Sequence, residues 1–178
     1  ELKGLVKEVQ QLISTTIQTT RRISHDLLPP VLDKFGLVAA LEELCEQSSR
    51  SDQLTVDFEV NDSELQPEED TVKLNTFRIV QEMMSNSIRH GQATIIQIRL
   101  QLEQDNFILH YEDNGKGFDA AQIEEHKGLG LRNMDSRAKM MGAQITYEST
   151  PGQGMKARLS TRNRRIATRE VIENIAKT

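Results

Sequence analysis

The sequence is poor in several residues that often carry special chemistry. Its 178 residues include no tryptophan and a single cysteine, and aromatic residues make up only 4% of the chain. One cysteine excludes an internal disulfide and any metal cluster held by several cysteines. No apolar run is long enough to cross a bilayer, and no signal peptide is visible. We therefore expect a cytoplasmic protein with a core of aliphatic and methionine side chains.

Positive charge is also scarce relative to negative charge. Lysine and arginine together number 22 against 27 aspartate and glutamate residues, which gives a net charge of −5. Binding to nucleic acid needs a positive field that this composition does not supply, so we expect no nucleic-acid partner. The local basic cluster of Arg162, Arg164 and Arg165 is short and is typical of a solvated surface.

The N-terminal segment has the pattern of an amphipathic helix. Apolar residues recur at three- and four-residue spacing from Leu2 to Leu27. Their stripe is narrow, and such stripes usually contact another helix, so we expect a bundle or a homodimer contact. Pro29 and Pro30 interrupt the pattern, and a second helical stretch follows Gly36. Because the chain begins inside a helical pattern and without methionine, we expect it to be part of a longer protein.

After residue 52 the sequence alternates between strand and helix patterns. Period-two alternation predicts strands at 54–60, 96–102, 107–111, 145–147 and 155–159. The expected core positions of the helices between them are Leu74, Phe77, Val80, Met84 and Ile88, then Leu131, Met134, Ala138 and Met141. Hairpin-linked strands leave no room for crossover helices, which excludes a doubly wound parallel sheet. The pattern predicts an α+β fold, a two-layer α/β sandwich with helices on one face, preceded by a helical stem.

The stretch "YEDNGKGF", residues 111–118, combines an acidic residue with two glycines. Asp113 has the same strand parity as Phe107, so its carboxylate should point to the buried face. A buried carboxylate is costly unless it accepts hydrogen bonds, and an adenine amino group would donate one. Gly115 and Gly117 would let the backbone turn sharply and approach a flat ring. A turn in which Asp113 caps the local backbone is the alternative interpretation.

The stretch "HKGLGLRNM", residues 126–134, places two glycines directly before an apolar-periodic helix. Bare backbone N–H groups at Gly128 and Gly130 and the positive end of the helix favour a phosphate there. Two glycines before a helix are also common in ordinary loops. Their position shortly after the first glycine-containing stretch favours the phosphate site.

The stretch "VQEMMSNSIRH", residues 80–90, carries polar residues at helical spacing. Glu82 and Asn86 are four residues apart and share one helix face, beside the apolar stripe. Their oxygen atoms, together with phosphate oxygens, would suit Mg²⁺. Arg89 and His90 follow one turn later, where they would approach the phosphates. The alternative is a helix with ordinary solvated polar residues.

These stretches, in this order, resemble the motifs of the ATP-binding domain shared by gyrase-type ATPases, heat-shock chaperones, mismatch-repair ATPases and sensor histidine kinases. This is the GHKL, or Bergerat, fold, with a mixed and mostly antiparallel sheet. "QEMMSN" resembles its N-box, "DNGKGF" its first glycine box and "GLGL" its second. "FRIVQEMMSNSIRHGQAT" and "GLGLRNMDSRAKMMGAQI" resemble bacterial two-component sensor kinases paired with helix-turn-helix response regulators. One departure is Met155, where that family usually has threonine.

The resemblance implies a set of site residues and the cofactors ATP and Mg²⁺. Glu82 would assist catalysis, Asn86 and Glu82 would hold Mg²⁺, and Asp113 would recognise adenine. The implied nucleotide-binding residues also include Arg89, His90, Gly115, Gly117, Phe118, Gly128, Leu129, Gly130 and Leu131.

His25 resembles a phosphoacceptor histidine because it is followed by an aspartate. In the resembled subgroup, however, the phosphoacceptor lies on the first helix of a dimerising hairpin, well before the Leu-Pro segment. Here the segment "LLPPVLDKFGLVAAL" begins two residues after His25, which leaves no room for a loop and a second helix. We therefore expect His25 to be a polar residue of the second hairpin helix.

The expected organisation has three parts: a helical stem at 1–50, a GHKL ATP-binding domain at 51–161 and a tail at 162–178. The expected function is transfer of the ATP γ-phosphoryl group to a histidine on a dimerisation helix, with relay to a response regulator. The fragment should lack that histidine, and any membrane attachment should lie in segments outside it. The alternatives are an anti-sigma-factor-type serine kinase and a non-catalytic nucleotide-binding regulatory module.

Overall fold

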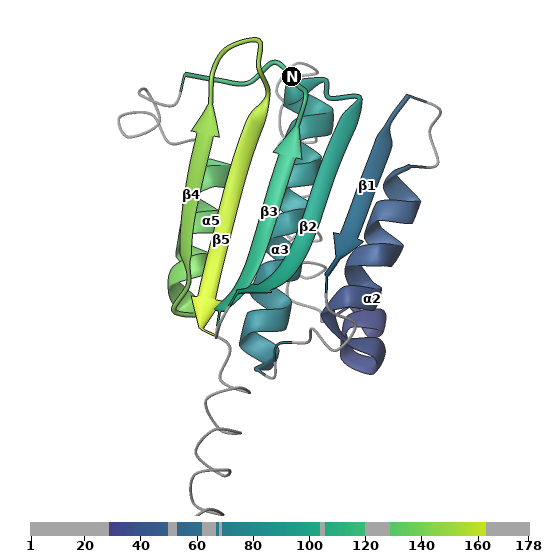
Figure 1. Cartoon of the computed structure of the whole chain (residues 1–178), viewed down its shortest axis with the longest axis vertical. Coiled ribbons are helices and arrows are strands. Elements are labelled where there is room, and N and C mark those ends of the chain that lie inside the picture. The colour runs from purple at the N-terminus through teal and green to yellow at the C-terminus, as the bar shows by residue number, and fades with distance from the viewer. Residues whose placement is uncertain are drawn as a thin grey trace, which may run out of the picture.

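The computed structural model describes residues 29–49, 53–61, 67, 69–103, 106–119 and 129–162. Within them a sheet is covered on one face by helices (Figure 1). The elements in chain order are α2 (Pro30–Ser48), β1 (Thr55–Val60), α3 (Asp70–Asn86), the π-helical turn η1 (Ser87–Gly91), β2 (Ile95–Glu103), β3 (Asn106–Asp113), α5 (Leu129–Met140), β4 (Gln144–Ser149) and β5 (Met155–Arg162).

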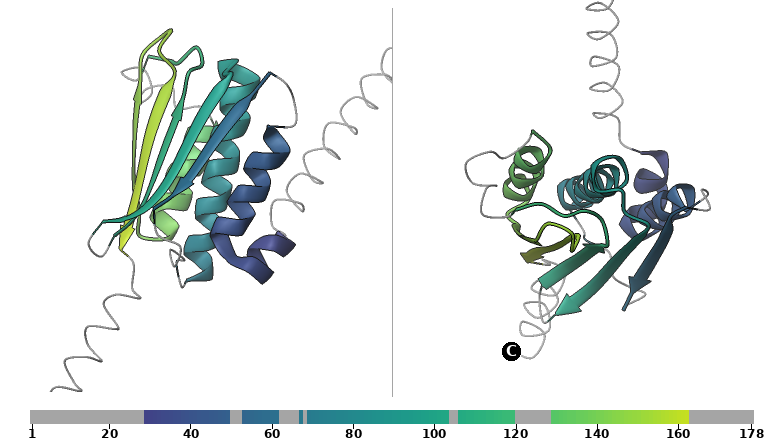
Figure 2. Two further views of the ribbon diagram at one scale, coloured as in Figure 1. Left: turned by 45° about the vertical axis from the view of Figure 1, so that its right-hand side comes forward. Right: turned by 90° about the horizontal axis from the view of Figure 1, so that it is seen from above.

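The sheet is mixed and mostly antiparallel. Its five strands lie in the order β1-β2-β3-β5-β4. The β1–β2 pair is parallel, whereas β2–β3, β3–β5 and β4–β5 are antiparallel. Helices α2, α3 and α5 lie side by side on one face of this sheet (Figure 2). The predicted two-layer α/β sandwich is thereby confirmed.

Helix α2 packs into the same hydrophobic core as the sheet. Leu37 and Leu41 are fully buried there, and α2 contacts both α3 and β1. Pro30 begins the helix, where a missing N–H costs nothing, and Gly36 bends it by adopting a left-handed φ of 83°. The predicted stem thus includes a helix that is part of the core. Residues 1–28, with His25, lie outside the described residues, and so the predicted dimer contact stays a prediction.

The π-helical turn η1 corrects one prediction about the core. We expected Ile88 in the apolar stripe of the preceding helix, but its side chain is 42% exposed, whereas Ser87 is only 4% exposed. A π turn accommodates more residues than an α turn, which changes the direction of the side chains that follow it. The turn closes when the Ala93 N–H donates to the Ser87 carbonyl at 3.0 Å. The other predicted stripe positions lie in or against the core.

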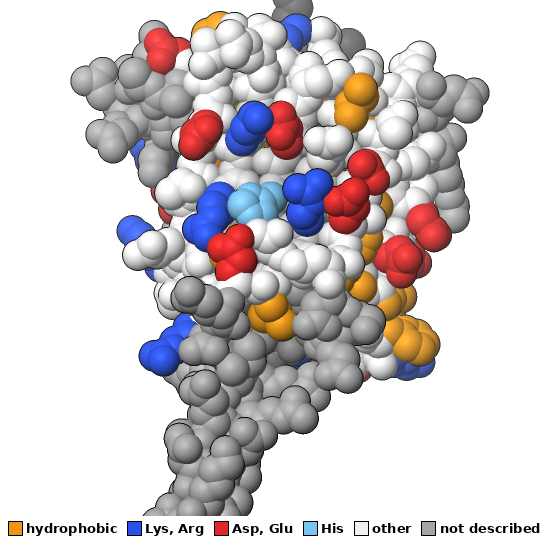
Figure 3. All heavy atoms as spheres, viewed as in Figure 1, with side chains coloured by type: hydrophobic (Ala, Val, Ile, Leu, Met, Phe, Trp, Pro, Cys, Tyr) orange, Lys and Arg blue, Asp and Glu red, His pale blue; other side chains and the backbone are white. Residues whose placement is uncertain are grey.

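The uncovered face of the sheet is charged, and its charges are paired across strands (Figure 3). Among the described residues, ion pairs join Arg99 to Glu59 at 2.7 Å and Lys156 to Glu112 at 2.9 Å. Such exposed pairs each contribute only about 0–1 kcal/mol. Their effect is to keep an uncovered sheet face hydrated. None of the described helices is long and apolar enough to span a bilayer.

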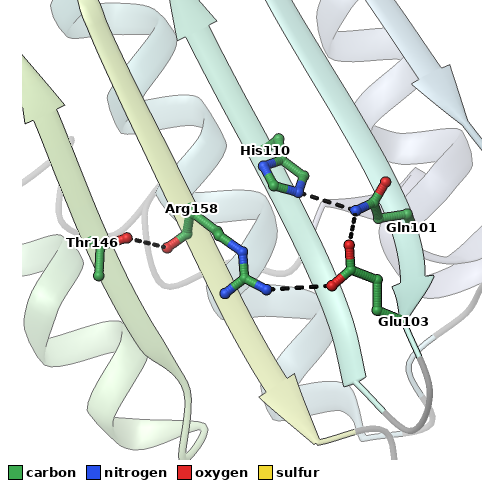
Figure 4. Close-up of polar contacts among 5 residues, drawn as sticks. All are labelled: Gln101, Glu103, His110, Thr146 and Arg158. Carbon is green, nitrogen blue, oxygen red and sulfur yellow. Dashed lines mark hydrogen bonds and ion pairs between the residues drawn. The ribbon is translucent and has the colours of Figure 1, made fainter.

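His110 lies in the middle of this charged face, in register with Arg99 on one side and Arg158 on the other. Its Nε2 is 3.1 Å from Nε2 of Gln101, and Arg158 makes a 3.5 Å ion pair with Glu103 nearby (Figure 4). Partial burial and the positive charge of Arg158 lower the pKa of His110 below its ordinary value. The neutral imidazole therefore fits this site better than the charged one.

This environment predicts a pH dependence of stability. Because the folded pKa of His110 lies below the unfolded value of about 6.5, the unfolded chain binds more protons once the pH falls below that value. The free energy of unfolding should therefore decrease as the pH falls below about 6.5. His110→Gln should remove this contribution and make the decrease shallower. Urea unfolding of both proteins between pH 8 and pH 5 measures it, and parallel pH profiles would contradict it.

Candidate functional site

Two of the stretches singled out in the sequence, residues 80–90 and 111–118, meet around one cavity. Its volume is about 190 Å³, and it lies between the end of α3, the turn η1, the end of β3 and the start of β5. The lining residues are Asn86, Ser87, His90, Gly91, Asp113, Gly117, Phe118 and Met155. A larger hollow of about 310 Å³ lies on the uncovered sheet face, and the side chains that line it include the ion-paired Glu59, Arg99, Glu112 and Lys156. The smaller cavity is lined by the predicted site residues Asn86, His90, Asp113, Gly117 and Phe118.

Asp113 forms the polar floor of this cavity. It ends β3, and its side chain is only 7% exposed, as its strand parity predicted. The Gly115 N–H donates to Oδ1 at 2.8 Å, and the Ser87 hydroxyl donates to Oδ2 at 2.7 Å. These donors offset the cost of burying the carboxylate and leave further lone pairs free to accept.

Tyr111 contacts the Ser87 hydroxyl that donates to Asp113. Its hydroxyl lies 2.8 Å from Ser87 Oγ, and its side chain is 1% exposed. Burial raises the pKa of the Tyr111 phenol, and so the hydroxyl keeps its proton. The sequence analysis assigned no role to Tyr111 or Ser87. The shared strand parity with Asp113 points to Tyr111, and the three- and four-residue spacing from the buried Met84 and Met83 points to Ser87.

The predicted glycines Gly115 and Gly117 stand where the backbone is crowded. A Cβ on Gly115 would lie 2.8 Å from the Gly91 carbonyl oxygen, and the Lys116 N–H donates to that same oxygen at 2.8 Å. Gly117 has a φ of +60°, and a Cβ there would collide with the Thr150 carbonyl oxygen. No residue with a side chain could hold this loop so close to η1 and to the β4–β5 turn.

The β4–β5 turn, residues 150–154, holds the glycine loop in place. Ser149 Oγ accepts from the Phe118 N–H at 2.9 Å and donates to the Gly154 carbonyl at 2.6 Å. Gly154 has a φ of +74°, and a Cβ there would collide with the Asp113 carbonyl oxygen. The turn thus contacts the backbone of the residue whose carboxylate forms the cavity floor.

Glu82 and Asn86 meet the start of α5. The Asn86 Nδ2 donates to Glu82 Oε1 at 3.2 Å, as their spacing of one helical turn predicted. A Cβ on Gly130 would lie 2.5 Å from Glu82 Oε1 and 3.2 Å from Asn86 Nδ2. The fold therefore brings the first turn of α5, with its unpaired backbone N–H groups, against this polar pair.

The remaining predicted site residues lie at different depths. His90 lines the cavity, Arg89 and Leu129 are exposed, and Leu131 is half-buried against the core. Gly128 lies outside the described residues. Within the described part of the chain, no group of three or more His, Cys, Asp or Glu side chains is placed to hold a metal. Any cation at Asn86 would therefore need oxygen atoms from a ligand or from water.

Comparison with known proteins gives relatives over most of the chain. Residues 70–165 match the family described as "Histidine kinase-, DNA gyrase B-, and HSP90-like ATPase". The chain is 33% identical over 159 residues to the sensor histidine kinase ComP of Bacillus subtilis (strain 168), a match that covers 88% of this chain and 20% of ComP. It is 29% identical over 154 residues to the oxygen sensor histidine kinase NreB of Staphylococcus carnosus (strain TM300), a match that covers 86% of this chain and 44% of NreB.

Solved structures show the same fold. The histidine kinase domain of the Erythrobacter litoralis EL346 blue-light activated histidine kinase matches with a TM-score of 0.60 and 15% identity, over 71% of this chain and 61% of that one. The catalytic domain of histidine kinase ThkA matches with a TM-score of 0.58 and 18% identity, over 71% of this chain and 90% of the ThkA chain. The chain spans less than half the length of ComP and of NreB.

The β4–β5 turn provides a test of the contact at Asp113. Gly152→Ala and Gly154→Ala both place alanine at a positive φ, +82° and +74°, which costs about 1–2 kcal/mol. Around Gly152 a Cβ would meet nothing within 4 Å, whereas at Gly154 it would also meet the Asp113 backbone. Gly154→Ala should therefore lower the free energy of unfolding by about 2 kcal/mol more than Gly152→Ala. Urea unfolding of both variants measures the difference, and equal losses would contradict it.

Proposed function

Because the chain belongs to the family of histidine kinase-, DNA gyrase B- and HSP90-like ATPases, we propose that it is the ATP-binding catalytic portion of a sensor histidine kinase. In this proposal it transfers the γ-phosphoryl group of ATP to a histidine on a dimerisation helix, for relay to a response regulator. The names of its relatives support the kinase assignment. The homodimer through the segment before residue 30 remains part of the same proposal.

The observation that carries the proposal is the buried Asp113 carboxylate at the floor of a cavity with apolar walls. Phe118 and Met155 line that cavity, which suits the flat faces of a purine. An ionised carboxylate only accepts hydrogen bonds, so it pairs with the 6-amino group of adenine. Gly115 and Gly117 keep the neighbouring backbone free of side chains, as a ring lying close to it requires.

The triphosphate would extend from this cavity toward Glu82, Asn86 and the start of α5. The N-terminus of a helix favours negative charge, and Gly130 places the α5 backbone directly against the polar pair. Because Asn86 Nδ2 is turned toward Glu82, its amide oxygen faces away from that carboxylate. Asn86 and Glu82 would hold Mg²⁺, which neutralises phosphate charge when it is bound.

The protein's own part in phosphoryl transfer is positioning and charge neutralisation. Glu82 is held by its contact with Asn86 and is half-buried beside the phosphate path, where it would accept the proton of an approaching nucleophile. His90 on the cavity wall and Arg89 beside it would contact phosphate oxygens, together with Gly128, Leu129 and Leu131.

Replacing Asp113 tests the adenine assignment. Asp113→Asn removes the charge and turns one acceptor into a donor, which faces the 6-amino group unfavourably. We expect ATP affinity to fall by about 10- to 100-fold, because a hydrogen bond to a charged group contributes about 1.5–3 kcal/mol. Calorimetric titration with ATP measures the change, with circular dichroism as a check of the fold. ATP binding that is unchanged in the variant would contradict the assignment.

Phosphate transfer to a separate substrate tests the kinase activity. A helical hairpin that carries a phosphoacceptor histidine, taken from a histidine kinase and supplied in trans, should be phosphorylated in the presence of ATP and Mg²⁺. Asn86→Ala should remove the Mg²⁺-dependent part of ATP affinity and reduce transfer by at least about tenfold. Radiolabelled ATP detects the acid-labile phosphohistidine. ATP binding without any transfer would favour a non-catalytic regulatory module.

A further inference from the structure

The hydroxyl groups of Tyr111 and Ser87 form a continuous chain with the Asp113 carboxylate. The distances are 2.8 Å from Tyr111 Oη to Ser87 Oγ and 2.7 Å from Ser87 Oγ to Asp113 Oδ2. All three side chains are at least nine-tenths buried, with exposed fractions of 1%, 4% and 7%. None of these contacts with Asp113 was assigned from the sequence motifs. The role of this hydrogen-bonded chain of side chains therefore needs an explanation.

The direction of the hydrogen bonds follows from the chemistry of the groups. An ionised carboxylate has no proton to give, so Ser87 must donate its single proton to Asp113. The Ser87 oxygen is then free to accept, and Tyr111 is the donor to it. Burial raises the pKa of Tyr111, so this donor persists over the pH range in which proteins are stable. Tyr111 thus donates to Ser87, and Ser87 donates to Asp113.

We propose that Ser87 and Tyr111 are positioning residues that set the base specificity of the pocket. They hold the Asp113 carboxylate in one orientation, so that it accepts a hydrogen bond from the 6-amino group of adenine and repels the 6-oxo group of guanine or hypoxanthine. This inference rests on the proposed binding of ATP in the same cavity. It adds specificity-determining residues that lie behind the base-contacting group.

The donors of Asp113 explain why orientation matters. Gly115 N–H holds Oδ1 and the Ser87 hydroxyl holds Oδ2, so neither oxygen is free to leave its place. Without the Ser87 donor, the carboxylate is free to rotate about its Cβ–Cγ bond. A rotated carboxylate no longer directs an acceptor at the 6-amino group of adenine. Loss of the Ser87 hydroxyl thus weakens the preference for adenine over a 6-oxo purine.

The backbone places Ser87 for this role. Ser87 is the first residue of η1, and its carbonyl accepts the Ala93 N–H that closes the turn at 3.0 Å. Ser87 keeps α-helical φ and ψ angles, and its N–H donates to the Met83 and Met84 carbonyls, so the end of α3 directs its side chain inward, whereas the neighbouring Ile88 is 42% exposed. A hydroxyl is thereby buried within hydrogen-bond distance of Asp113 Oδ2. π turns are frequently found at functional sites.

The experiment compares ATP with inosine triphosphate, which differs from ATP by a 6-oxo group in place of the 6-amino group. Calorimetric titration of the 178-residue chain gives the ratio of the two affinities. Ser87→Ala should reduce the preference for ATP about tenfold, because a charge-assisted hydrogen bond is lost. Tyr111→Phe should reduce it about threefold, because the lost bond is between neutral groups. Ser87→Thr keeps the hydroxyl and should keep the preference within about twofold.

Matched control variants come from elsewhere in the chain. Tyr147 donates to Asp135 Oδ1 at 3.2 Å, and Ser48 donates to the Leu44 carbonyl at 2.8 Å, both away from the cavity. Tyr147→Phe and Ser48→Ala delete the same chemical groups and should leave the preference for ATP unchanged. These controls distinguish the general effect of losing a hydroxyl from the specific effect of losing the Ser87 or Tyr111 hydroxyl.

Each outcome decides a different point. The proposal is overturned if the Ser87→Ala and Tyr111→Phe proteins bind both nucleotides more weakly but at an unchanged ratio of ATP to inosine triphosphate affinity. That result would show a merely structural role for the two hydroxyls. If Ser87→Ala does not fold, the ratio for Tyr111→Phe decides alone. An unaltered chain without any preference for ATP would overturn the adenine pocket itself. A preference that persists in both variants would overturn only the role of Ser87 and Tyr111.

Discussion

The burial of one carboxyl group governs the architecture around the cavity. Asp113 ends a strand inside the sheet, and its side chain is 7% exposed, so it needs donors from the protein. Gly115 supplies a backbone N–H and Ser87 supplies a hydroxyl. The first donor requires a tight loop after β3, and the second comes from the junction of α3 and η1. The loop after β3 and the end of α3 therefore meet at one carboxylate.

Close contacts between backbones hold those segments together. The loop after β3 meets η1 through Gly91 and Gly115, and it meets the β4–β5 turn through Gly117 and Gly154. Asn114 adds a further connection, since its Oδ1 accepts from the N–H groups of Thr94 and Ile95 at the start of β2. Glycine is required where these loops touch because a Cβ would occupy the space of a neighbouring carbonyl oxygen. The backbone around the cavity floor is closely packed for this reason.

The two faces of the sheet are stabilised in different ways. The helix-covered face buries aliphatic side chains, including fully buried Leu41 of α2 and Ile98 and Leu100 of β2. The other face is open and carries ion pairs between neighbouring strands, such as Arg99 with Glu59. The residues proposed to bind ATP lie at the end of the covered layer, where helices and strand-connecting loops meet. There the backbone has N–H groups that neither the helices nor the sheet use.

The sequence alone determined the sandwich architecture, because strand and helix periods follow directly from which side chains must leave water. It also determined the burial of Asp113 by parity and the pairing of Glu82 with Asn86 by helical spacing. Local periodicity assumes a regular helix, so it placed Ile88 in the core, and it overlooked Ser87 because it counts only apolar residues. Only the tertiary structure decided which hydroxyls reach Asp113 and that Gly130 packs on Glu82, because those contacts join segments far apart in the chain. Their geometry depends on how helices and loops pack in three dimensions, which no local pattern encodes.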